Sequence, residues 1–176
     1  MNGMNSMTGK RKLSFVSRTR CNHGLEHATI NILSEHHPGL RLAGYSNPFG
    51  FTIIGQVQND DLVNAIEEAQ NRVSAGKFRL VLHDHCGTNL VAGGLLTGFA
   101  AWLATLGVRR GIRAQFERLP LVILFTTLAV LFSPAFGIWL QKNVTTSSEV
   151  QGLEIVKISQ GKFWKYPRFY IRTRPQ

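Results

Sequence analysis

The sequence predicts an α+β fold, in which a two-helix transmembrane hairpin is inserted into a small mixed domain. Two long, uncharged apolar runs at residues 90–108 and 119–140 predict the hairpin. Short segments with strand and helix periodicity on both sides of these runs predict the mixed domain. We therefore expect a basic flexible tail at 1–20, an α+β domain at 21–89, the hairpin at 90–140, and C-terminal strands at 141–176 that complete the α+β domain.

The first flank is expected to fold as helix, strand, strand, helix and strand. Apolar residues recur at the helical period up to His36, and Pro38 and Gly39 end that helix. A run of Ser, Asn, Pro and Gly then separates two strands, and a second amphipathic helix follows. The expected elements are a helix at 22–36, strands at 40–45 and 51–57, a helix from 59 or 60 to 74, and a strand at 78–82.

Each apolar run has the length of a membrane span, since a helix of about 20 residues crosses the hydrocarbon core. Pro120 lies near the start of the second run, where a proline of the first turn is tolerated, and Pro134 is expected to kink it. A buried hairpin in a soluble core is the alternative, which two uncharged runs of this length disfavour. Two strands at 153–158 and 169–173, with Gly161 between them, complete the chain.

The charge balance predicts an anionic neighbour. Twenty Lys and Arg residues against ten Asp and Glu residues give a net charge of +10. Because no recognition helix, zinc finger or aromatic RNA-binding signature accompanies this charge, we expect lipid headgroups as partners and no nucleic acid. Small residues on the first apolar run favour close packing of this helix against another helix. The partner helix can belong to this chain, to a second copy in a homo-oligomer, or to another subunit of a larger membrane complex. Four arginines precede the second run, namely Arg109, Arg110, Arg113 and Arg118.

The membrane orientation follows from two opposing arguments. The arginines between the two apolar runs favour a cytoplasmic position for the connecting loop, which would require export of both flanks. Export of 89 N-terminal residues without a signal sequence is, however, harder than export of the short loop. We therefore expect both ends of the chain, and with them the α+β domain, in the cytoplasm.

The histidines and cysteines gather in two parts of the chain. In the first, His23 and His27 are four residues apart, which places two imidazoles on one helix face, as a metal requires. With Glu26 they form H-x-x-E-H, the inverted zinc-protease motif, in which the glutamate acts as general base on a metal-bound water. The second part lies immediately before the first apolar run and offers further donor atoms, on His83, Asp84, His85 and Cys86.

The same residues also fit structural roles. The histidines can serve as polar surface or helix-capping groups, and Cys21 and Cys86 as small core residues. Asn89, after Gly87 and Thr88, is expected to cap the first apolar helix. A site at this position, beside the membrane surface, can accept a substrate with a lipid-soluble part.

Three segments carry a resemblance to a known family: CNHGLEHATI, GYSNPFGFTIIGQV, and HDHCGTN followed by two apolar helices. They resemble an uncharacterised bacterial family of short two-helix membrane proteins found in phototrophic phyla such as cyanobacteria and Chloroflexota. The resemblance covers residues 21–140 and implies an inner or photosynthetic membrane, but no particular reaction. Relatives often carry proline in place of Asp84. The implied signature residues are Cys21, His23, Glu26, His27, His85, Cys86, Gly87, Thr88 and Asn89.

Three functions fit these observations. The first is a membrane-anchored hydrolase, with zinc on His23, His27 and His85 or His83, and with Glu26 as general base. The second is a protein that binds chlorophyll or haem, or a dechelatase that removes magnesium from chlorophyll while Glu26, Asp84 or a histidine supplies protons. The third is a non-enzymatic assembly subunit of a membrane complex.

Overall fold

The structure is a computed structural model that describes residues 14–107 and 111–176. It divides into two compact units, which we describe separately. The first unit comprises the described residues up to Val81 together with Thr146–Gln176, and the second comprises those of Leu82–Thr145. The mixed α+β class expected from the sequence is confirmed, because the described residues form four α-helices and a four-stranded antiparallel sheet.

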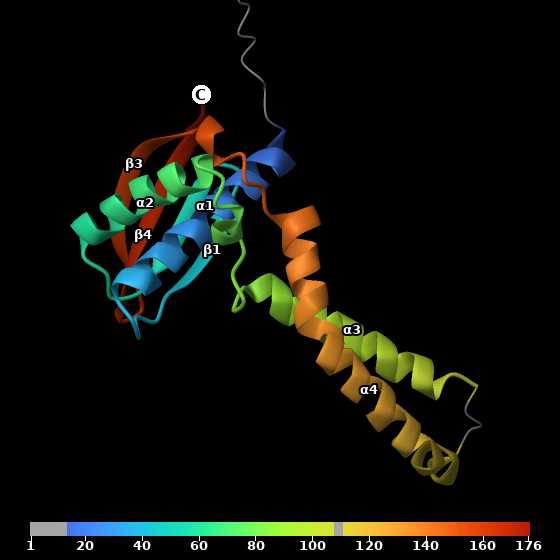
Figure 1. The fold of residues 1–176 in the computed structure, drawn as a ribbon. Coiled ribbons are helices and arrows are strands. Elements are labelled where there is room, and N and C mark those ends of the chain that lie inside the picture. The colour runs from blue at the N-terminus through green and yellow to red at the C-terminus, as the bar shows by residue number, and fades with distance from the viewer. Residues whose placement is uncertain (1–13, 108–110) are drawn as a thin grey trace, which may run out of the picture. The chain divides into compact units, whose positions relative to one another are not determined.

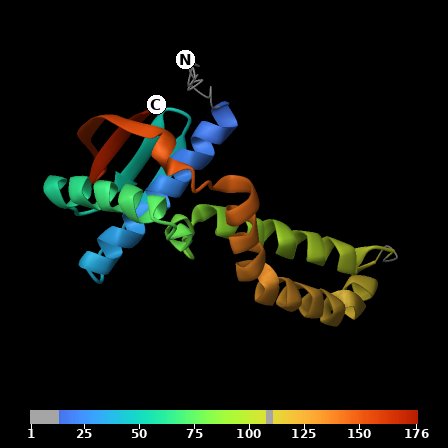
Figure 2. The ribbon, with the colours of Figure 1, turned by 45° about the horizontal axis from the view of Figure 1, so that its top comes forward.

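The first unit is a two-layer structure of helices on a sheet. Figures 1 and 2 show α1 and α2 side by side on one face of the sheet, whose strand order is β1-β2-β4-β3. Its elements are α1 (Phe15–His36), β1 (Ala43–Asn47), β2 (Gly50–Ile54), α2 (Asn59–Ser74), the 3-10 turns η1 (Phe78–Val81) and η3 (Val150–Gly152), β3 (Leu153–Phe163) and β4 (Tyr166–Pro175).

The core of this unit lies between the helices and the sheet. On the two central strands, β2 and β4, large fully buried side chains recur at every second residue and meet the apolar faces of the two helices. Burial of an aliphatic or aromatic side chain contributes about 1.5–3 kcal/mol, so this layer is the main source of stability. The largest buried residues include Phe51, Ile53, Phe169 and Ile171 from the sheet, and Leu25, Ile32, Leu33 and Leu62 from the helices.

Helix α1 begins seven residues before the expected start at Asn22. Ser14 caps it, because the Ser14 hydroxyl accepts a hydrogen bond of 3.2 Å from the backbone N–H of Ser17. Residues 15–20 therefore belong to a helix, and the prediction of a flexible tail was wrong for them. The remainder of that predicted tail, residues 1–13, lies outside the described residues, as do Arg109 and Arg110.

The strand expected at residues 78–82 is instead the 3-10 turn η1, and that prediction was wrong. The physical reason lies in the backbone carbonyls of this segment, which side chains of α1 take up in place of a neighbouring strand. Asn31 donates a hydrogen bond of 2.9 Å to the carbonyl of Leu80, and His27 bonds the carbonyl of Val81. The segment thus packs along α1 and stays outside the sheet.

The other strands of the first unit differ from prediction in their bounds. β1 and β2 lie within a few residues of the expected ranges, and α2 matches its expected range. The C-terminal strands are longer than expected, and Gly161 lies inside β3, opposite Arg168, and not between the strands. The connecting loop is formed by Trp164 and Lys165, between the paired residues Phe163 and Tyr166.

The second unit is a helical hairpin in which α3 (Gly87–Thr105) packs against α4 (Ile112–Leu140), as Figure 1 shows. A π-helical turn, Gln141–Thr145, continues α4. Both helices are long and apolar enough to cross a membrane. Gly93 allows the close approach, because a Cβ at this position would collide with the Ser133 hydroxyl. Pro120 lies inside α4 and not in its first turn, because the helix begins eight residues before it.

Cys86 caps α3, and the expectation that Asn89 is the cap was wrong. The Cys86 sulfur accepts a hydrogen bond of 3.4 Å from the backbone N–H of Thr88. Asn89 instead lies in the first turn of the helix, where its side-chain amide donates a bond of 2.9 Å to the carbonyl of Asp84.

Asn22 is predicted to be a main polar contact of the α+β unit. Its buried amide donates to the carbonyl of Asn47 at 2.8 Å and accepts from the hydroxyl of Thr173 at 2.7 Å. Replacement by alanine leaves both buried groups unsatisfied, so we expect Asn22→Ala to lower the free energy of unfolding by roughly 2–4 kcal/mol. Urea unfolding of the detergent-solubilised chain measures this.

The matched control is Asn64→Ala, on the exposed side of α2. It should change the free energy of unfolding by less than about 0.5 kcal/mol. Equal stability of the two variants would contradict the importance of the Asn22 contacts.

Candidate metal centre

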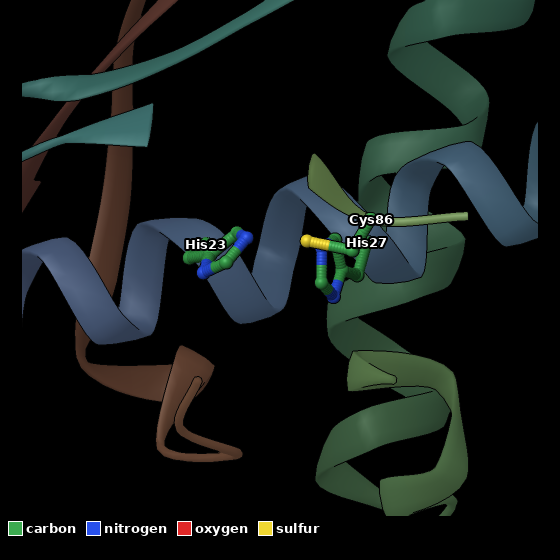
Figure 3. Close-up of side chains that lie close together, drawn as sticks. All are labelled: His23, His27 and Cys86. Atoms are coloured by element: carbon green, nitrogen blue, oxygen red, sulfur yellow. The ribbon is translucent and has the colours of Figure 1, made fainter. Parts of the chain in front are cut away.

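Helix α1 places His23 and His27 beside one another, as the sequence spacing predicts. The two ring centroids are 4.3 Å apart and the ring planes make an angle of 61°. Figure 3 shows these imidazoles on successive turns of α1, drawn together with Cys86, a residue of the second unit. His27 is only 2% exposed, whereas His23 is partly exposed. One helix face therefore offers two imidazoles.

The tautomer of the neutral His27 ring is set by its hydrogen bond to the backbone. Nδ1 lies 2.9 Å from the carbonyl oxygen of Val81, in a buried contact. A carbonyl only accepts, so Nδ1 carries the hydrogen and Nε2 carries the lone pair. This is the arrangement found around metal-binding histidines, where an outer acceptor fixes the tautomer and orientation of the ring.

Glu26 lies on the adjacent side of α1, because successive helical residues are about 100° apart. Its carboxylate is 3% exposed and accepts a short hydrogen bond from the Ser46 hydroxyl of β1. Gly44, on the same face of that strand as Ser46, leaves the necessary space, since a Cβ there would lie 2.9 Å from the Glu26 carboxyl carbon. β1 therefore fixes the position of this carboxylate.

Ser46, Gly44 and Val81 are contributors to the site that the sequence did not single out. The alternation of strand residues places Gly44 and Ser46 on one face, and this was the available signal for the first two. No side-chain pattern marks Val81, because it acts through its backbone carbonyl.

Cys21 lies two residues before His23 on α1 and is buried in the core. Burial raises the pKa of its thiol, and a hydrogen bond to Ser147 opposes part of this rise. The thiol is therefore protonated at neutral pH and acts as a small core residue. Cys21 and Cys86 form no disulfide bond.

The second predicted cluster lies in the second unit, where a buried glutamine orders its backbone. Gln141 is 0% exposed. Its side-chain oxygen accepts from the N–H of His83 at 2.9 Å, and its amide donates to the His83 carbonyl at 3.0 Å and to the Asn89 side chain at 2.6 Å. These contacts tie the segment before α3 to the end of α4.

The side chains of this segment differ in exposure. The Nδ1 of His83 accepts a hydrogen bond of 3.2 Å from the backbone N–H of His85, and the two ring centroids are 6.0 Å apart. Asp84 and His85 are exposed, whereas His83 and Cys86 are partly buried. The structure thus pairs His23 with His27 in one unit and His83 with His85 in the other.

Comparisons with known proteins give a family but no activity. An uncharacterised protein of the cyanobacterium Picosynechococcus sp. is 31% identical over 157 residues, which cover 79% of this chain and 69% of the relative. No solved structure matches the chain. A family model described as a domain of unknown function matches residues 18–158, so the chain belongs to this family, DUF6391.

Proposed function

We propose that this protein is a membrane-anchored, metal-dependent hydrolase whose first two metal ligands are His23 and His27. The observation that carries the proposal is the buried hydrogen bond between His27 Nδ1 and the Val81 carbonyl. It leaves the lone pair on Nε2, the form in which imidazole binds a metal. Zinc is the proposed ion, because it accepts two histidines with a further protein ligand and keeps one position for water.

The third ligand in this proposal comes from the segment that follows Val81. His83 and Cys86 come two and five residues after Val81, and five residues of chain span at most about 18 Å. The backbone itself therefore limits how far these donors can lie from Val81, whose carbonyl bonds His27. We favour Cys86, because it caps the N-terminus of α3 and a helix N-terminus favours a thiolate. His83 and His85 are the alternative donors.

Glu26 is the proposed general base. A zinc ion held by His23 and His27 would lower the pKa of a bound water, and the Glu26 carboxylate would accept the proton that this water gives up as it attacks a carbonyl or phosphoryl centre. The hydrogen bond from Ser46 supports this role. In this bond the Glu26 side chain is the acceptor, and a carboxylate that accepts hydrogen bonds is the form that can take up a proton. Asp84 is exposed and is the second proposed acid–base group.

The anchor in this proposal is the α3–α4 hairpin. Its length and apolar composition support a membrane span, and its surface carries large exposed apolar side chains such as Leu90, Leu95, Leu131 and Phe132. Exposed apolar area on this scale is typical of a protein surface that contacts lipid. We place the α+β unit on the cytoplasmic side of a bacterial inner or photosynthetic membrane, where a substrate with a lipid-soluble part is accessible.

Tetrapyrrole binding is the second candidate. The facing pair of imidazoles, His23 and His27, supports it, because imidazole is a ligand of haem iron. A Soret or chlorophyll absorption band in the purified chain would favour this candidate over the hydrolase.

Metal content tests the proposed ligands. We expect the detergent-purified chain to hold one metal ion, measured by elemental analysis. Loss of a residue that only hydrogen-bonds to a metal ligand weakens metal affinity by roughly 10- to 100-fold. His27→Ala removes a ligand itself, so we expect a larger loss of affinity. The control is His36→Ala, an exposed histidine of α1 that pairs with Glu68, which should bind metal as the parent does. A parent chain without metal would refute the proposal.

Glu26→Gln tests the general base. Glutamine can still accept the hydrogen bond of Ser46, so the fold and the bound metal should be retained while hydrolysis falls by roughly 10²- to 10⁴-fold. Turnover of ester, amide and phosphoester substrates measures this, with the exposed Glu67→Gln of α2 as control. Full activity of Glu26→Gln would eliminate Glu26 as the base.

Membrane extraction tests the anchor. We expect the chain to stay in the membrane fraction after an alkaline carbonate wash. Leu131→Arg, at an exposed position of α4, should lower the share of the chain that stays in the membrane fraction. A charge at the centre of a span costs about 2.5–3.5 kcal/mol on insertion scales. Arginine at Val156 of β3 is the control. A parent chain released by carbonate would show that the hairpin does not span the bilayer.

A further inference from the structure

The β3–β4 hairpin of the α+β unit ends in a cluster of exposed aromatic residues. Trp164 is 84% exposed and Phe163 is 57% exposed, and Tyr166 begins β4 beside them. We call residues 163–166 the aromatic tip. Trp and Phe are large apolar side chains that usually gain stability from burial, so their exposure at one short turn calls for a partner outside the unit.

The backbone of the aromatic tip points to the same conclusion. Among the residues that the structure describes, Trp164 is the one non-glycine residue with a positive φ, 53°. A left-handed conformation costs a residue with a side chain about 1–2 kcal/mol, and glycine is the usual residue where a two-residue hairpin turn requires it. The tip therefore carries a bulky tryptophan at a position where its own unit buries little of the side chain.

Positive charge accompanies these aromatic rings. The Lys165 ammonium lies 5.1 Å from the centre of the Trp164 ring and 5.5 Å from that of Tyr166. Lys162 and Arg168 flank the tip, and residues 161–168 contain no acidic residue. Tryptophan and tyrosine with flanking lysines are typical of the layer where a bilayer meets water, since the rings contact acyl chains and the ammonium groups reach the headgroups.

A groove next to the aromatic tip extends this surface. It has a volume of about 500 Å³ and its lining includes Leu40, Arg41, Leu42 and Tyr166. The groove thus shares Tyr166 with the tip and combines apolar walls with one further cation.

We propose that the aromatic tip enters the interfacial layer of a bilayer with anionic headgroups, as a membrane contact separate from the α3–α4 hairpin. The proposal rests on the proposed function only in that the hairpin, continuous with this unit at Val81 and Thr146, keeps it at the bilayer surface. Trp164 and Phe163 contact the upper acyl chains, and Lys162, Lys165 and Arg168 bind the phosphate groups of the lipids.

Tryptophan fluorescence tests this directly, because the chain contains three tryptophans and two lie in the second unit. The full chain is reconstituted into vesicles of phosphatidylcholine and phosphatidylglycerol in two variants. Trp102→Phe with Trp139→Phe leaves Trp164 as the reporter, and Trp139→Phe with Trp164→Phe leaves Trp102 as the reporter of the hairpin. Each is measured with lipids brominated near the headgroup and with lipids brominated deep in the acyl chain.

We expect Trp164 emission to shift to the blue and to lose intensity most with the shallow bromines. Replacing Lys162 and Lys165 by glutamine, or omitting phosphatidylglycerol, should reduce this loss and leave Trp102 quenching unchanged. Trp164 that emits as in water and is quenched by acrylamide but not by brominated lipid would overturn the proposal. So would protection of Trp164 by added RNA without lipid, which would indicate a nucleic-acid partner.

The two reporters separate this proposal from the membrane span. Quenched Trp102 with unquenched Trp164 would overturn the tip contact and leave the span intact. Unquenched Trp102 with quenched Trp164 would refute the span, while the tip would stand as a peripheral lipid contact.

Discussion

The hydrogen bond between His27 Nδ1 and the carbonyl of Val81 connects the fold of this protein to its candidate chemistry. It is buried, and it joins residues 54 positions apart in the sequence. On the structural side, it holds the turn η1 against α1 at the point where the chain leaves the α+β unit. On the chemical side, it assigns the hydrogen of the imidazole to Nδ1 and the lone pair to Nε2. One contact therefore sets both the path of the backbone and the ring nitrogen that carries the lone pair.

Local sequence patterns predicted those elements whose stability comes from neighbouring residues. The helix α2 matched its expected range, because a complete apolar face at the helical period lies between clear start and stop signals. The facing pair His23 and His27 followed from their spacing of four. The apolar helices α3 and α4 were recognisable from composition alone, although both begin before the expected residue.

The differences arose where distant residues decide the structure. Residues 78–81 have the composition of a strand, but Asn31 and His27 take up the carbonyls that a strand would offer to a neighbour. The turn between β3 and β4 was expected around Gly161, yet it lies at Trp164, where glycine would be the ordinary choice. Likewise the placement of Glu26 depends on Ser46 and Gly44, which only the packing of α1 on β1 brings to it.

The strand order of the sheet has a consequence for how the chain is made. β2 pairs with β4, and the whole second unit lies between them in the sequence. Synthesis proceeds from the N-terminus, so α3 and α4 leave the ribosome when β2 has only β1 as its partner and β4 does not yet exist. A lone two-stranded ribbon is marginally stable. The apolar helices α3 and α4 must therefore reach their final environment while the sheet of the α+β unit is still incomplete. Biosynthesis thus has a fixed order, in which closure of the sheet is the final step.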